Sequence, residues 1–257
     1  MEKIDLNNKK EIWYDLFKTS LSCILANPNS EYNNELHTAQ WMADKGLEAF
    51  LEKFPNNDKN KILPFVSNLN TNGYNAVDLG LPSGTLWCDR NVGAKSPEDY
   101  GLYFAWGETE GYKDCSKRKF TEKNYRFNSF DRYKDRTELL LKDDAAYVNM
   151  GSDWHMPTDK QIQELIDNTF HDVEVVNGNK GMRYISKKDT SKSIFMPFAG
   201  GCYSGNPVSV GSYGYCWSSS RNDVSNGYYL YCISNGDTYL SYYGGRYLGF
   251  SVRGVLG

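Results

Sequence analysis

From residue 193 to its C-terminus the chain contains no lysine, glutamate, glutamine or histidine. Soluble domains normally coat their surface with charged residues, Lys and Glu above all. Residues 201–253 are instead rich in Tyr, Ser, Gly and Asn and hold ten of the chain's 20 tyrosines. An antibody paratope has this composition, because Tyr supplies stiff contact area with a polar tip while Ser, Asn and Gly supply adaptable hydrogen bonds. The composition therefore predicts a binding surface mounted on a scaffold.

Other absences exclude whole classes of protein. No apolar run approaches the roughly 18 residues that a membrane helix needs, so we expect no membrane insertion. The first residues, MEKIDLNNKKEIWYDLF, include acids and lack the apolar segment of a Sec signal peptide, so we expect synthesis in a cytoplasm. A net charge of -3 gives no reason to expect nucleic acid as a partner. The ordinary charged content of 24% indicates a globular chain.

The cysteines and histidines lack the spacing of a metal site. No C-x-x-C pair occurs, and no Cys/His cluster has zinc spacing, so we expect no metal and no cofactor. An even number of cysteines permits disulfides, but without a signal peptide free or buried thiols are the favoured expectation. The six cysteines are Cys23, Cys88, Cys115, Cys202, Cys216 and Cys232.

The N-terminal part predicts a helical hairpin over residues 1–58. Apolar residues recur at helical spacing in 12–25 and again in 36–54, and the sequence Asn-Pro-Asn-Ser at 27–30 marks a turn between them. Residues 59–76 have the composition of a linker. The hairpin could be a docking or oligomerisation module, or a cap on the main domain, and the sequence favours neither.

From residue 77 onward, strand and turn patterns dominate. Thr158 and Gln161 form a capping box that opens a helix with Ile162, Leu165 and Ile166 on one face. His155 precedes that helix without a recognisable catalytic motif around it, which favours a structural role over a catalytic one. The remaining expectations are a strand, turn and strand at 77–87, an aromatic core segment at 100–108, a short helix at 143–149, strands at 182–186, 193–197 and 250–255, a strand end at 217–220 and mostly loop at 203–215.

The basic, aromatic segment 115–136 has two interpretations. Its Lys and Arg residues could contact nucleic acid, but Asp and Glu are mixed among them, which favours a long solvated loop.

Near the C-terminus, two arms at 228–233 and 238–243 flank Asn235-Gly236, the strongest short hairpin signal. Period-2 geometry sends Leu230 and Leu240 to one face and the interleaved Tyr and Ser residues to the other. The favoured interpretation is that the leucines anchor the hairpin and the tyrosines face a partner. The alternative is that the tyrosines cover a second hydrophobic layer with only their hydroxyls wet.

The scaffold residues resemble the Fibrobacter succinogenes major paralogous domain, a family common in Bacteroidetes and their phages. The resemblance covers 77–255, with three departures: His155 where the family has Arg, Met150 where it has Trp, and Gly254 where it has Pro. The matching segments are VDLGLPSGTLW at 77–87, YFAWGE at 103–108, DDAA at 143–146, WHMPT at 154–158, YCWSS at 215–219 and SVR at 251–253.

The resemblance implies an α+β, C-type lectin-like domain of the formylglycine-generating-enzyme type over 77–257. Within that family, residues 201–253 look like the variable region of a diversity-generating retroelement protein. Such systems randomise adenines in AAY codons, which cannot produce Lys, Glu, Gln, Met or Trp. Under this hypothesis Cys202, Cys216 and Cys232 are random outcomes without a structural task.

The function that this implies is binding of a cell-surface protein or glycan, as a receptor-binding protein of a Bacteroides phage or prophage located on the virion tail. Trp87, Trp106, Trp154, Trp217, Leu230 and Leu240 are assigned to the scaffold. The candidate ligand contacts are Tyr203, Ser204, Asn206, Ser212, Tyr213, Tyr215, Arg221, Asn222, Ser225, Asn226, Tyr229, Tyr231, Asp237, Tyr239, Ser241, Tyr242, Tyr243, Arg246 and Tyr247.

Other functions are less well supported by the sequence. An oxidase like the formylglycine-generating enzymes needs a closely placed cysteine pair, which these cysteines do not reproduce, so we expect no enzyme. Calcium-dependent sugar binding needs several oxygen ligands, and Asp223 and Asp237 are the only acids in the stretch. A non-diversified structural or interaction protein, in which the N-terminal hairpin binds the partner, is the remaining alternative. Several copies would strengthen a weak variable site through avidity.

Overall fold

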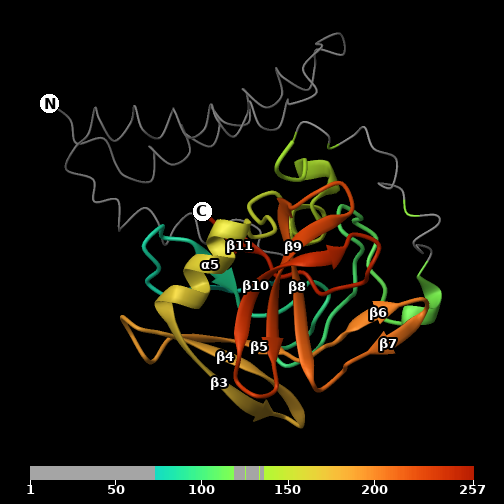
Figure 1. The fold of residues 1–257 in the computed structure, drawn as a ribbon. Helices are drawn as coiled ribbons and strands as arrows, with labels where there is room; N and C mark the ends of the chain where they lie inside the picture. The colour runs from blue at the N-terminus through green and yellow to red at the C-terminus, as the bar shows by residue number, and fades with distance from the viewer. Residues whose placement is uncertain (1–72, 119–124, 126–132, 134–135) are drawn as a thin grey trace, which may run out of the picture. The chain divides into compact units, whose positions relative to one another are not determined.

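The computed structural model describes residues 73–118, 125, 133 and 136–257 (Figure 1). The chain divides into two units, Met1–Val66 and Ser67–Gly257, and every described residue belongs to the second. The helical hairpin expected at 1–58, the linker up to residue 72 and most of the basic segment after Arg118 lie outside the described residues. No helix in the described part is long and apolar enough to span a membrane.

The described domain is α+β, with β-sheet predominating and few helices, as expected at this level. One sheet has the order β10-β9-β8, a second has the order β3-β4-β5, a third has the order β1-β2-β11, and β6 pairs with β7 alone (Figure 1). The strands are β1 Ala76–Asp78, β2 Leu86–Cys88, β3 Thr169–Val176, β4 Asn179–Ser186, β5 Ser193–Pro197, β6 Gly201–Tyr203, β7 Asn206–Val208, β8 Tyr213–Arg221, β9 Asn226–Ile233, β10 Thr238–Gly245 and β11 Val255–Leu256.

The two described α-helices begin at side-chain caps. In α5, Asp159–Asn168, the expected capping box is confirmed: Thr158 accepts from the Gln161 backbone N–H, and the Gln161 side chain accepts in return. The short helix α4, Ala145–Met150, begins where Asp144 accepts from two backbone N–H groups. Two 3₁₀ turns also occur, η1 at Cys115–Lys117 and η3 at Leu141–Asp143.

His155 has a structural role, as expected. Its Nδ1 lies 3.0 Å from the carbonyl oxygen of Met156 and its Nε2 lies 3.0 Å from that of Gly257. The ring therefore connects the segment before α5 to the end of the chain.

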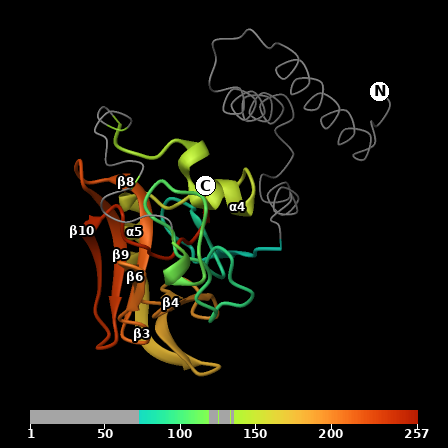
Figure 2. The ribbon, with the colours of Figure 1, turned by 90° about the vertical axis from the view of Figure 1, so that its right-hand side faces the viewer.

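The β10-β9-β8 sheet lies along one side of the described domain (Figure 2), and its residues belong to two apolar clusters. Residues of one parity, such as Leu230, pack with α5 and Trp87, while residues of the other parity, such as Trp217, pack with Trp106 and Phe250. The expected scaffold tryptophans are all fully buried, as is Leu230, and Leu240 is partly buried against the same cluster. Core residues therefore pack against both faces of this sheet over part of its area.

Arg253 connects three separate chain segments from inside the domain. Its side chain is fully buried, and its three nitrogens donate to Asn91 Oδ1, the Cys88 carbonyl and the Phe195 carbonyl, each at 2.9 Å. Burial lowers the pKa of the guanidinium, but the hydrogen bonds replace the water that it has lost. The last segment of the chain is thereby fixed to β2 and β5.

Two sequence-based expectations about strands were wrong, and one strand was missed. Residues 203–215 were expected to be mostly loop, but β6 and β7 form a hairpin there, aided by positive φ at Ser204 and Gly205. The strand expected at 250–255 is only β11, since Phe250 and Ser251 make isolated bridges. β3 was not predicted, because its exposed residues give no apolar alternation and its pairing partner, β4, supplies the order.

Two opposed glycines in β9 and β10 are required for packing. A Cβ at Gly244 would lie 2.8 Å from the Trp217 ring, and one at Gly227 would lie 2.9 Å from the Trp106 ring. We expect Gly244→Ala to lower the free energy of unfolding by about 1–3 kcal/mol through overpacking. Urea unfolding would measure it. Ser241→Ala in the same strand is the control, and equal stabilities of the two variants would contradict the prediction.

Candidate binding surface

The β9–β10 hairpin forms as predicted. Its register places Tyr231 opposite Tyr239 and Leu230 opposite Leu240, and Gly236 in the turn has a φ of +100°. The leucines lie on the face packed by α5, so the interleaved tyrosines lie on the other face. The sequence therefore predicted the pairing and the two faces of this hairpin correctly.

On that face the tyrosine rings form a continuous row from the interior to solvent. The Tyr215 ring stacks on buried Phe250 at 4.7 Å and on the Tyr231 ring at 5.3 Å. Tyr231 also lies 5.5 Å from the ring of Tyr213 and 6.5 Å from that of Tyr239, which is 49% exposed. We call Tyr213, Tyr215, Tyr231 and Tyr239 the tyrosine row. It begins as a second hydrophobic layer, as in the alternative interpretation, and ends with an exposed ring at Tyr239.

Two expected contact residues are buried instead. Tyr229 is only 9% exposed and lies edge-on to Trp217 at 5.9 Å. Arg246 is 4% exposed, its guanidinium lies 4.4 Å from the Trp106 ring centre, and it donates to the carbonyl oxygens of Asn226 and Asp223. Both belong to the scaffold, because a buried side chain cannot meet a partner.

A second group of tyrosines arises from a β-bulge. Between Ser241 and Gly244 the register of β10 shifts against β9, and both residues of the bulge, Tyr242 and Tyr243, are exposed. Their rings lie 4.2 Å apart, their hydroxyls are 3.0 Å apart, and Tyr243 is 73% exposed. A bulge redirects side chains in this way. Tyr228, which was not among the expected contacts, lies 6.4 Å from Tyr242, and its parity places it on the face of Leu230.

Residues of the turn after β8, several of them expected contacts, are engaged in hydrogen bonds with backbone groups. Asp223 accepts from the backbone N–H groups of Ser225 and Asn226, each at 2.7 Å, and Asn222 donates to the Tyr242 carbonyl at 3.0 Å. Burial raises the pKa of Asp223, but hydrogen bonds from the Asn226 side chain and from those two backbone N–H groups bring it below its ordinary value. Arg221 donates to the Asp223 carbonyl at 3.1 Å. Asp223, Val224 and Ser225 are the exposed residues of this turn, whereas Arg221, Asn222 and Asn226 are partly buried.

Two polar contacts remain exposed around the β9–β10 hairpin. Asp237 accepts from the Asn235 amide at 2.7 Å, and its hydrogen bond to Tyr239 raises the pKa of that phenol. Ser212 is exposed before β8, while Ser241 is partly buried in β10. These residues place small polar groups beside the tyrosine row.

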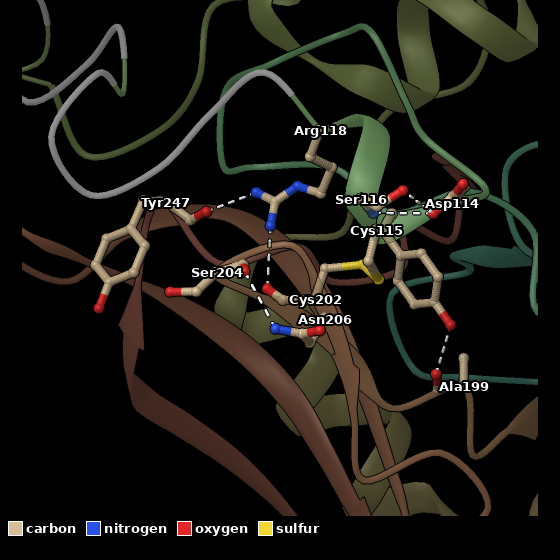
Figure 3. The surroundings of a disulfide bond; sticks show 10 residues. Asp114, Cys115, Ser116, Arg118, Ala199, Cys202, Ser204, Asn206 and Tyr247 are labelled. Carbon is tan, nitrogen blue, oxygen red and sulfur yellow. Dashed lines mark hydrogen bonds between the residues drawn. A yellow bond between two sulfur atoms is a disulfide. The ribbon is translucent and has the colours of Figure 1, made fainter.

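The third exposed group lies on the β6–β7 hairpin. Tyr203, Ser204 and Asn206 are exposed, and the Tyr203 ring lies 6.4 Å from that of half-buried Tyr247. The group adjoins a disulfide between Cys115 and Cys202 (Figure 3). This bond corrects the expectation of free thiols, and it gives Cys202 a structural role. Sequence spacing could not reveal it, because 87 positions separate the two cysteines.

The other described cysteines are buried free thiols. Burial raises the pKa of Cys216 to about 11, and raises those of Cys88 and Cys232 to about 12. A thiol must ionise to act as a nucleophile, so at neutral pH these three groups are unreactive. Cys216 and Cys232 also line a cavity of about 10 Å³, which has room for about one water molecule.

Within the residues that the structure describes, no group of three or more His, Cys, Asp or Glu side chains could hold a metal ion. The chain was compared with family models, curated proteins and solved structures, and none of them matches. The α+β architecture and the exposed tyrosines are therefore the observations from which a function has to be argued.

Proposed function

We propose that the described domain binds a protein or glycan on a target cell through its exposed tyrosines. The observation that carries the proposal is that large aromatic side chains remain exposed on a fully packed frame. Tyr203, Tyr239, Tyr242 and Tyr243 are all exposed, while the residues behind them, such as Trp217, are buried. Exposed apolar groups that cluster on one surface are a common feature of interaction sites.

The packing between the rings supports binding with little loss of entropy. Each ring of the tyrosine row contacts at least one other ring, so its rotamer is restricted before a partner arrives. Side chains that are ordered beforehand lose less freedom on association. Tyrosine also offers a large apolar area and one hydroxyl, which suits both protein and glycan partners.

The finer features of the proposal come from the family resemblance. We propose a C-type lectin-like fold of the formylglycine-generating-enzyme type, with residues 201–253 varied by a diversity-generating retroelement. A phage or prophage protein that binds a bacterial receptor is the context in which such variation is useful. The exposed positions fit it, since the side chains of residues 203–210, apart from Gly205, and of Tyr242 and Tyr243 lie outside the buried frame.

The binding role can be tested by truncating tyrosines in the full chain. We expect Tyr231→Ala, Tyr239→Ala and Tyr243→Ala together to weaken binding of the labelled protein to intact Bacteroides cells by about 30-fold or more, since one central tyrosine often contributes about 2 kcal/mol. Binding is measured by flow cytometry on a strain panel chosen with the wild-type protein.

The matched control is Phe170→Ala, which removes an exposed aromatic ring from β3. It should leave cell binding unchanged. Wild-type affinity in the triple variant would contradict the assignment of the site.

Diversification has its own test in the flanking DNA. We expect a near-copy of the gene segment for 201–253 that differs mainly at adenines and lies close to a reverse-transcriptase gene. Genome sequencing of the source would show it. A genome that lacks both the copy and the reverse transcriptase would refute diversification while leaving the binding proposal intact.

A further inference from the structure

The Cys115–Cys202 disulfide lies at the base of the β6–β7 hairpin and joins it to η1 (Figure 3). Both cysteines are buried, in a small cluster with Tyr103 and Ala199. The hairpin that extends from this point carries Tyr203, with Ser204 and Asn206 beyond it. The disulfide is therefore the covalent anchor of one part of the candidate surface.

Few other interactions hold this hairpin. Its two strands pair over only three positions, and β7 is exposed along its whole length. Cys202 and Gly249 exchange two backbone hydrogen bonds, of 2.7 and 3.0 Å. The Tyr103 hydroxyl donates to the Ala199 carbonyl at 2.6 Å, just before β6. An isolated two-stranded hairpin is at best marginally stable in water, so it depends on these anchors.

Arg118 forms the second anchor, and the disulfide helps to position it. Its Nη1 donates to the Cys202 carbonyl at 3.0 Å and its Nη2 donates to the Tyr247 carbonyl at 2.6 Å (Figure 3). Burial lowers its pKa to about 10, which still leaves it charged at neutral pH. Its backbone N–H donates to the Cys115 carbonyl at 3.2 Å. One arginine thus joins η1, β6 and the segment that bears Tyr247.

The β8–β10 part of the surface is supported differently. Its tyrosine row stacks on buried Phe250, which in turn packs against Trp217, and none of the three strands contains Cys115 or Cys202. Loss of the disulfide would leave this packing in place. The two parts meet where the Gly200 N–H donates to the Tyr213 carbonyl at 2.8 Å, but the disulfide lies on the β6–β7 side alone.

We infer that formation of the Cys115–Cys202 disulfide completes the binding surface by fixing the β6–β7 hairpin. In the reduced protein the β8–β10 tyrosines keep their positions, whereas Tyr203, Ser204 and Asn206 do not. The role in binding rests on the proposed function, but the ordering of the hairpin does not depend on a ligand.

The chemistry is an ordinary thiol–disulfide exchange. The two cysteine thiols lose two electrons and two protons to a small-molecule disulfide such as oxidised glutathione. A sulfur–sulfur bond forms in the protein, the bond in the oxidant breaks, and two small thiols leave. The three buried free thiols stay out of this exchange, because their raised pKa values keep them protonated.

Hydrogen exchange of the full chain, followed by mass spectrometry, tests the inference without any ligand. In the double variant Cys115→Ser and Cys202→Ser, we expect amides of 201–208 to exchange at least about tenfold faster than in the oxidised wild type. Amides of 226–245, in the same molecule, should change by less than about twofold. Arg118→Gln keeps the disulfide and should loosen the same hairpin, which provides a second test if the double variant does not fold.

Cys232→Ala is the matched control, because it removes a buried thiol from the frame and leaves both anchors intact. It should not accelerate exchange at 201–208 selectively. Unchanged exchange at 201–208 in the double variant and in Arg118→Gln would overturn the inference. Equal acceleration in both segments would also do so, as would peptide mapping that finds both thiols free in oxidised protein.

Cell binding separates this inference from the proposed function. A double variant with a loosened hairpin and wild-type binding would overturn the claim that the hairpin completes the surface. The binding proposal itself would be unaffected, because it is tested at Tyr231, Tyr239 and Tyr243.

Discussion

Replacing Arg253 with methionine should lower the free energy of unfolding by about 3–5 kcal/mol. Methionine fills most of the space but donates no hydrogen bond. Asn91 Oδ1 and the carbonyl oxygens of Cys88 and Phe195 would then stay buried without the donor they now have. Each unsatisfied acceptor is destabilising by about 1–3 kcal/mol, and partial rearrangement keeps the sum below the maximum.

Urea unfolding followed by tryptophan fluorescence measures this effect. Arg136→Met is the matched control, since Arg136 is exposed, and it should change stability by less than about 0.5 kcal/mol. If the two arginine variants were equally stable, the hydrogen bonds of Arg253 would not stabilise the fold as we expect. The prediction concerns the frame alone and is independent of any ligand.

Trp217→Ala should lower the free energy of unfolding by about 3–5 kcal/mol, as much as Arg253→Met does. The substitution leaves a cavity beneath the β8–β10 sheet. The Trp217 ring is fully buried, lies 4.4 Å from the Phe250 ring, and donates from its Nε1 to the Phe104 carbonyl at 2.9 Å. Tyr229 packs edge-on against it. Loss of this ring removes support from the tyrosine row as well as from the core.

Trp217→Phe separates the two contributions of that side chain. Phenylalanine keeps most of the apolar contact but leaves the Phe104 carbonyl without its donor, so we expect a loss of about 1–3 kcal/mol. Thermal unfolding by calorimetry would rank the variants as wild type, Trp217→Phe, then Trp217→Ala. A Trp217→Ala protein as stable as wild type would contradict the packing described above.

Arg246 and Tyr229 show where sequence patterns were insufficient. Arg246 stands among Tyr, Gly and Asn, so its composition indicated an exposed contact, yet it lies over Trp106. Tyr229 alternates with leucine like its neighbours, but its position along β9 places it over Trp217 rather than at the exposed end. Period 2 assigns a face of a sheet, and it does not say how far the core extends beneath that face.

The amino-acid sequence by itself determined the local elements of this protein. The capping box of α5, the Asn-Gly turn and the two faces of the β9–β10 hairpin all follow from short-range patterns, because caps, turns and alternation act over a few residues. Only the tertiary structure decided which tyrosines are exposed, where the bulge at Tyr242 and Tyr243 falls, and that Cys115 meets Cys202. Those features depend on residues far apart in the chain, whose proximity exists only after the sheets have packed.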